Sequence, residues 1–183
     1  MKKVISAFAG LIMALILPCA VVAVDNPVVS RDRSDDSSHV CLDSSRVSVH
    51  TLQKRLPSDS AAMHTFLWDN FITGPEEKLF TCPVLGWRKQ SQSFARVLVR
   101  KALGDSLDGA SLEKCLASVL ADSERNAYLP ISATKAMYRK APAWIILVKW
   151  EWADSSPREV LAHSRVFVLN AKDAHTVAFA TCD

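Results

Sequence analysis

The chain has 183 residues, a formal net charge of +3 and a hydrophobic content of 49%. This length supports one domain with a buried core and leaves too little chain for two. The near balance of acidic and basic residues argues against nucleic acid as a partner, because binding to phosphates needs a marked excess of positive charge.

The first 23 residues have the features of a secretory signal peptide. Lys2 and Lys3 form a basic start, an apolar run covers 4–17, and small residues continue to Ala23. We therefore expect cleavage after Ala23 and an exported protein, periplasmic or secreted, with no stable insertion in the membrane. Two alternatives stay open: an uncleaved membrane anchor, which Pro18 disfavours, and lipid modification of the cysteine that follows this proline.

Residues 24–38 are polar, carry charges of both signs and have no apolar period. This composition predicts a disordered leader, because too few apolar side chains are present to offset the entropy of ordering. A single α+β domain is then expected over residues 39–183.

Four cysteines remain after the signal peptide, and an even number in an oxidising compartment predicts two disulfides. Among the three connectivities we expect Cys41 with Cys82 and Cys115 with Cys182. No Cys-x-x-Cys pair is present in the sequence, so zinc binding and thioredoxin chemistry lack their usual spacing.

Three helices are predicted in the middle of the chain. The first covers 58–73 with Ser58 or Asp59 as its cap, the second runs from about 91 to 104, and the third begins at Ser111. A short strand is expected at 79–84, between the first helix and the second. The apolar positions recur at helical spacing and include Met63, Phe66, Leu67, Phe94, Val97, Leu98, Leu112, Cys115, Leu116 and Val119.

The last third of the chain predicts strands. Residues 143–152 are β-branched and aromatic, and 163–170 and 175–182 are expected to form a hairpin with a four-residue loop. The symmetric register places Val166 opposite Phe179.

This order of elements predicts an α+β fold in which two or three helices pack on a C-terminal antiparallel sheet of three to four strands. The two disulfides are expected to stabilise it.

Catalytic motifs are missing from the sequence. It contains no Gly-x-Ser-x-Gly, no His-Glu-x-x-His and no glycine-rich phosphate loop, and the histidines after residue 40 are scattered: His50, His64, His163 and His175. We therefore expect a protein that is not an enzyme and that binds neither a metal nor a cofactor.

Tryptophans are concentrated in the strand expected at 143–152. Trp150 and Trp152 fall on one face of its end, with Lys149 and Glu151 on the other, and these four residues are the candidate partner-binding group. Core packing is the alternative explanation for the tryptophans.

A second candidate is the basic group of Lys135, Arg139 and Lys140, with Arg125 nearby, which could face an acidic partner or an anionic membrane surface. A solvated helix or loop face is the alternative.

The sequence therefore predicts an exported, non-enzymatic module that binds another exported protein, as an inhibitor, immunity-type or adaptor protein does. The alternative is a carrier of a lipid or other small ligand, with an apolar pocket between the helices and the sheet.

Overall fold

The computed structural model describes residues 46–73, 87–121, 125–153 and 161–182. Several predicted features lie outside the described residues: the signal peptide, the disordered leader, the disulfide between Cys41 and Cys82, and the short strand at 79–84. No helix in these ranges is long and apolar enough to cross a membrane. The elements in chain order are β1 (Ser48–Arg55), α1 (Ser60–Leu67), the π-helical turn η2 (Trp68–Ile72), α2 (Trp87–Gly104), α3 (Gly109–Ala121), β2 (Asn126–Tyr138), β3 (Ala141–Trp152), β4 (His163–Asn170) and β5 (Thr176–Cys182).

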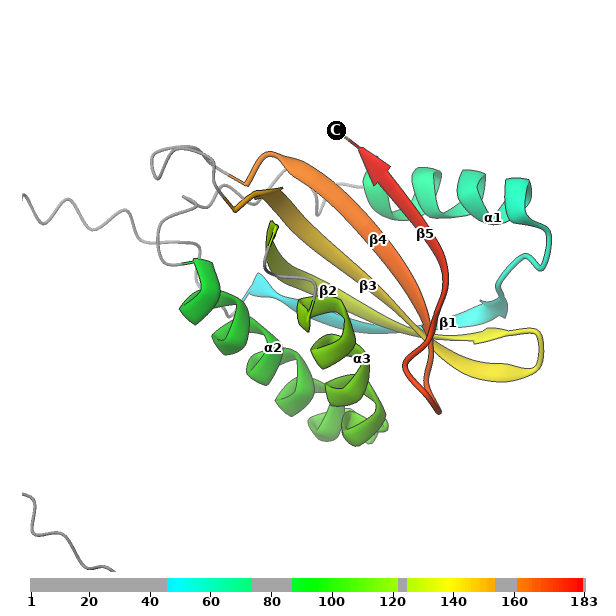
Figure 1. Cartoon of the computed structure of the whole chain (residues 1–183). Helices are drawn as coiled ribbons and strands as arrows, with labels where there is room; N and C mark the ends of the chain where they lie inside the picture. Colours follow the sequence, from blue (N-terminus) through cyan, green and yellow to red (C-terminus); the bar gives the residue numbers. More distant parts are fainter. Residues whose placement is uncertain (1–45, 74–86, 122–124, 154–160, 183) are drawn as a thin grey trace, which may run out of the picture. The chain divides into compact units, whose positions relative to one another are not determined.

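The five strands form one mixed sheet whose spatial order is the chain order, β1-β2-β3-β4-β5 (Figure 1). β1 runs parallel to β2, and every other neighbouring pair is antiparallel. The α+β class is confirmed, but the expectation of three to four antiparallel strands is wrong, because β1 precedes the helices and β2 follows them.

β2 was not predicted from the sequence, because its apolar and polar residues do not alternate. Its first nine residues are all buried, including Ser132 and Thr134, so both of its faces are covered. Pro130 also argues against a central strand in sequence, yet it lies where the register between β2 and β3 shifts. A bulge of this kind tolerates proline, since no ladder hydrogen bond is lost there.

Helices cover both sides of the sheet. α2 packs on β1 and β2, α3 packs on β3 and β4, and α1 with η2 packs on β4 and β5. Figure 1 shows α1 on the side of the sheet away from α2 and α3. The core between these layers consists of large buried side chains, among them Leu67, Leu98, Leu112, Trp144 and Leu147.

Aspartates cap the N-termini of α1 and α3. Asp59 caps α1 by accepting a hydrogen bond from the Ala62 amide at 2.9 Å, which confirms one of the two predicted caps. Asp108 accepts from the Ser111 amide at 3.0 Å at the start of α3. The Ser111 hydroxyl in turn accepts from Trp144 Nε1 at 2.8 Å and so joins this helix to β3.

The β4–β5 hairpin forms, but its predicted register holds only beside the loop. Leu169 lies opposite Thr176 as expected, whereas beyond a bulge at Val177 the pairs are Val168 with Ala178 and Phe167 with Phe179. One extra residue in β5 moves every later side chain to the other face of the sheet. Phe179 therefore shares a face with Phe167 and not with Val166.

The predicted disulfide between Cys115 and Cys182 is wrong, because the two thiols lie at opposite ends of β4. Both thiols are free in the structure. Cys115 Sγ lies 3.7 Å from the Asn170 carbonyl oxygen, while Cys182 is paired with Ser164 at the other end of β4. Six strand residues span roughly 20 Å, and a disulfide needs its Cα atoms within about 7 Å.

Candidate functional site

A row of aromatic side chains and one arginine crosses the sheet from β3 to β5. The ring centroids of Trp152 and Trp150 are 5.5 Å apart, and the Arg165 guanidinium lies 4.2 Å from the Trp150 ring. Arg165 is also 5.7 Å from the Tyr128 ring, whose centroid lies 5.8 Å from that of Phe167. The cross-strand partner of Phe167 is Phe179. We call these six residues the aromatic–arginine row: Trp152, Trp150, Arg165, Tyr128, Phe167 and Phe179.

Arg165 occupies the centre of the row and is held there by several contacts. Its Nη1 donates to Tyr128 Oη at 2.6 Å, and its Nε donates to Thr181 Oγ1 at 3.4 Å. A guanidinium against the faces of two aromatic rings is a favourable cation–π arrangement. The arginine thus fixes the rings of β2 and β3 relative to β4 and β5.

The two ends of the row are open to solvent while its middle is covered. Trp152 is 53% exposed and Phe179 is 61% exposed, whereas Trp150 and Tyr128 are buried. Arg165 and Phe167 are half-buried. Exposed large rings that continue into a packed, immobile layer are typical of surfaces that bind other proteins.

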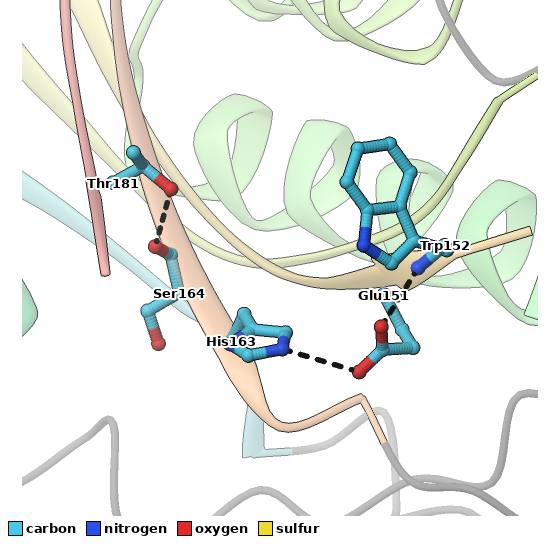
Figure 2. A network of polar contacts seen from close by, with 5 residues as sticks. All are labelled: Glu151, Trp152, His163, Ser164 and Thr181. Atoms are coloured by element: carbon cyan, nitrogen blue, oxygen red, sulfur yellow. Dashed lines mark hydrogen bonds and ion pairs between the residues drawn. The ribbon is translucent and has the colours of Figure 1, made fainter. Parts of the chain in front are cut away.

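A polar network holds the Trp152 end of the row in place, as Figure 2 shows. One oxygen of Glu151 accepts a hydrogen bond from the Trp152 amide at 3.0 Å, and the other lies 3.4 Å from His163 Nε2. The Glu151 carboxylate therefore ties the last residues of β3 to the first residue of β4. On β5, Thr181 Oγ1 donates to the Ser164 carbonyl oxygen at 3.5 Å.

The four predicted partner-binding residues are not equally accessible. Trp150, Lys149 and Glu151 are buried, with Lys149 Nζ donating to Ser164 Oγ at 2.9 Å, and only Trp152 presents much of its side chain to solvent. Trp150 packs within the domain, as the alternative explanation has it, and Trp152 remains the member that a partner can contact directly.

Sequence reasoning missed Arg165, Tyr128, Phe167 and Phe179 as members of a surface. Arg165 and Phe167 alternate with the buried Val166 in β4, and this alternation could have indicated a second, solvent-facing side of the strand. Phe179 was assigned to the opposite face because the bulge at Val177 has no sequence signature. Tyr128 was hidden by the failure to recognise β2.

Two buried polar atoms near the Trp152 end have no hydrogen-bond partner, namely Trp150 Nε1 and Asn126 Oδ1. Asn126 is the cross-strand partner of Trp152, so both atoms belong to the same end of the sheet. An unsatisfied buried group costs about 1–3 kcal/mol.

Potential metal ligands in the described part of the chain are scattered over separate elements. Within the described ranges, no three His, Cys, Asp or Glu side chains are grouped closely enough to hold a metal ion. Among the four histidines, His163 contacts Glu151 and His64 stacks on Trp68 at 6.1 Å between centroids, on different elements. Comparison of the chain with protein-family models, curated proteins and solved structures found no match.

Proposed function

We propose that the chain is an exported, non-enzymatic protein-binding module and that the aromatic–arginine row is its binding surface. The observation that supports this proposal is the exposure of two large rings: Trp152, which packs on Trp150, and Phe179, which lies opposite Phe167 in the β4–β5 register. Residues that dominate binding energies in protein interfaces are enriched in tryptophan, tyrosine and arginine.

The contacts inside the row favour binding by lowering its entropic cost. Immobilising a flexible side chain on binding costs about 0.5–1.5 kcal/mol. Arg165 is already held by Tyr128 and Thr181, and the backbone at Trp152 is already held by Glu151. The Arg165 side chain and the backbone at Trp152 therefore have little freedom to lose when a partner binds.

A carrier function is the second candidate, and one groove favours it. The groove lies between α2 and α3, has a volume of about 350 Å³ and is lined largely by apolar side chains such as Ala95, Val99, Leu116 and Leu120. It opens between the two helices, whereas the predicted position between helices and sheet is filled by core side chains such as Leu98 and Leu112.

The proposal is tested by capture of partners from the cell envelope on the full exported chain, with quantitative mass spectrometry of proteins and small molecules. The double variant Trp152→Ala/Phe179→Ala should lose a specific protein partner by at least tenfold, because each truncation of an interface anchor costs on the order of 1–2 kcal/mol. Leu103→Ala is the matched control, since Leu103 is 60% exposed and lies on α2 outside the row.

Thermal unfolding of all variants shows whether the loss is due to the surface alone, since these exposed side chains add little to the core. The row would be rejected as the binding surface if the Leu103 variant lost as much binding, or if the double variant bound the partner as well as the wild type does. A small molecule retained by the wild type without any protein would favour the carrier.

A further inference from the structure

β5 forms one edge of the sheet and has the features of a strand that can accept another. No described strand pairs with its outer side, because the sheet order ends at β5. Its seven residues, Thr-Val-Ala-Phe-Ala-Thr-Cys, include no charged residue and no proline. Edge strands in stable monomers are usually protected by one of these features, because free amides and carbonyls otherwise pair with another chain.

A groove runs beside the first half of this strand. It has a volume of about 620 Å³, and its walls are Thr176–Phe179 of β5, the start of α1 around Met63 and His64, and the tip of the β2–β3 hairpin at Tyr138 and Arg139. A strand on one side and a helix on the other is the geometry in which an extended peptide adds to a sheet.

The hairpin tip gives this groove a positive end. Arg139 Nη2 donates to the Ser58 carbonyl oxygen at 3.0 Å, and its guanidinium lies 5.2 Å from the Tyr138 ring. Lys140 follows it and is exposed. Among the described lining residues Asp59 is the single acid, and its carboxylate already accepts from the Ala62 amide. The groove therefore favours a carboxylate near Arg139.

The two residues of the hairpin tip have positive φ angles, which arginine and lysine adopt less easily than glycine and asparagine do. Arg139 and Lys140 have φ angles of 45° and 71°. Two-residue hairpin turns with positive φ prefer asparagine and glycine, because other side chains are strained in this region. The tip therefore carries Arg139 and Lys140 at two positions where the uncharged pair asparagine–glycine would be more stable.

We propose that this groove binds an extended segment of a partner protein, which adds to β5 as a sixth strand and places a carboxylate against Arg139. The proposal rests on the proposed function for its premise that the partner is a protein. It adds the binding mode, the backbone edge that is used and the chemistry of the segment.

The test uses the full exported chain and four fluorescent peptides that share the strand sequence Val-Thr-Val-Thr-Val-Thr. Three peptides begin with Glu, Gln or Lys and have blocked termini, and the fourth begins with Gln and ends in a free carboxylate. Fluorescence anisotropy measures affinity. Hydrogen–deuterium exchange with mass spectrometry measures protection of the backbone amides in β5 and β1.

We expect the Glu peptide to bind at least tenfold more tightly than the Lys peptide and to protect amides of β5 but not of β1. Arg139→Gln should reduce this preference to less than threefold. Phe179→Asp should weaken the Glu and Gln peptides alike, because it places a charge at the edge, whereas the matched control Leu103→Asp should not. Tighter binding of the fourth peptide would identify a chain terminus, and not a side chain, as the source of the carboxylate.

Three results would overturn the proposal: no binding of any peptide, binding without protection of β5, or a preference that survives Arg139→Gln. A dimer of the free protein in sedimentation that Phe179→Asp dissociates would also overturn it, by making a second copy the occupant of the edge. If the peptides fail while Trp152→Ala/Phe179→Ala still loses its native partner, strand addition is wrong and the proposed function stands. If the peptides bind and the native partner binds the double variant as well as the wild type, the aromatic–arginine row is not the binding surface.

Discussion

The two edges of the sheet are built from opposite kinds of sequence. β1 carries exposed cationic or titratable side chains at His50, Lys54 and Arg55, and its pairing with β2 is irregular between Thr51 and Arg55. β5 carries no charged residue and exposes Phe179 at its centre. Both edges therefore have an irregular register, and the difference between them is charge, which protects an edge from further pairing.

This difference in charge favours the addition of a strand at β5 over addition at β1. Adding a strand beside β1 would cover cations that need water or a counter-ion. The same addition at β5 covers only apolar and hydroxyl side chains. The aromatic–arginine row ends on β5, so a chain added there would also contact Phe179.

The cysteine at the end of β5 should react much faster than the cysteine in the core. Burial, together with the negative charges of Asp173 and Asp108, raises the pKa of Cys115 to about 11. Cys182 is half-buried at the end of β5. At pH 8 we expect iodoacetamide to alkylate Cys182 on the order of a hundredfold faster than Cys115, as measured by peptide mass mapping, because the thiolate is the reactive form. Comparable rates would show that the end of β5 is covered.

Removal of the charges on β1 should make this edge pair with other chains as β5 is expected to do. Lys54→Thr with Arg55→Val gives β1 an uncharged, β-branched end like that of β5. We expect self-association about tenfold stronger than in the wild type, measured by sedimentation velocity over a range of concentrations. Thr51→Lys added to the same variant should reverse the change. An unaltered monomer would mean that charge does not protect this edge.

Substitution of the hairpin tip should change the free energy of unfolding only slightly, and the sign of this change distinguishes strain in the turn from the contact of Arg139. Arg139→Asn with Lys140→Gly suits the positive φ angles of the turn and should raise the free energy of unfolding by about 1 kcal/mol in urea titrations. The same variant should lose the preference for an acidic peptide. A loss of stability would show that the contact of Arg139 with the Ser58 carbonyl oxygen outweighs the strain of the turn.

The helices were predictable because their signals are local. Asp59 and the apolar spacing through Met63 and Leu67 located α1, and the third helix lies within a few residues of its predicted start. Residues 143–152 were recognised as a strand because they are aromatic and β-branched. Local propensity and periodicity are sufficient where tertiary contacts agree with them.

The candidate surface could not be predicted to the same degree, because it depends on non-local pairing. Tyr128 reaches the row from β2, a strand whose burial on both faces removes any alternation. Phe179 reaches it through a one-residue bulge at Val177 that reverses the faces of β5. Neither feature can be recognised without the register of the neighbouring strands.

The central claim is that one side of the molecule, from Trp152 to the edge at β5, binds another protein. Photo-crosslinking tests it most directly, with a photoreactive phenylalanine analogue placed at position 179 or at the equally exposed position 103 in the cells that make the protein. We expect position 179 to form one covalent adduct with a single exported protein and position 103 to form none. Adducts from both positions, or from position 103 alone, would contradict the account.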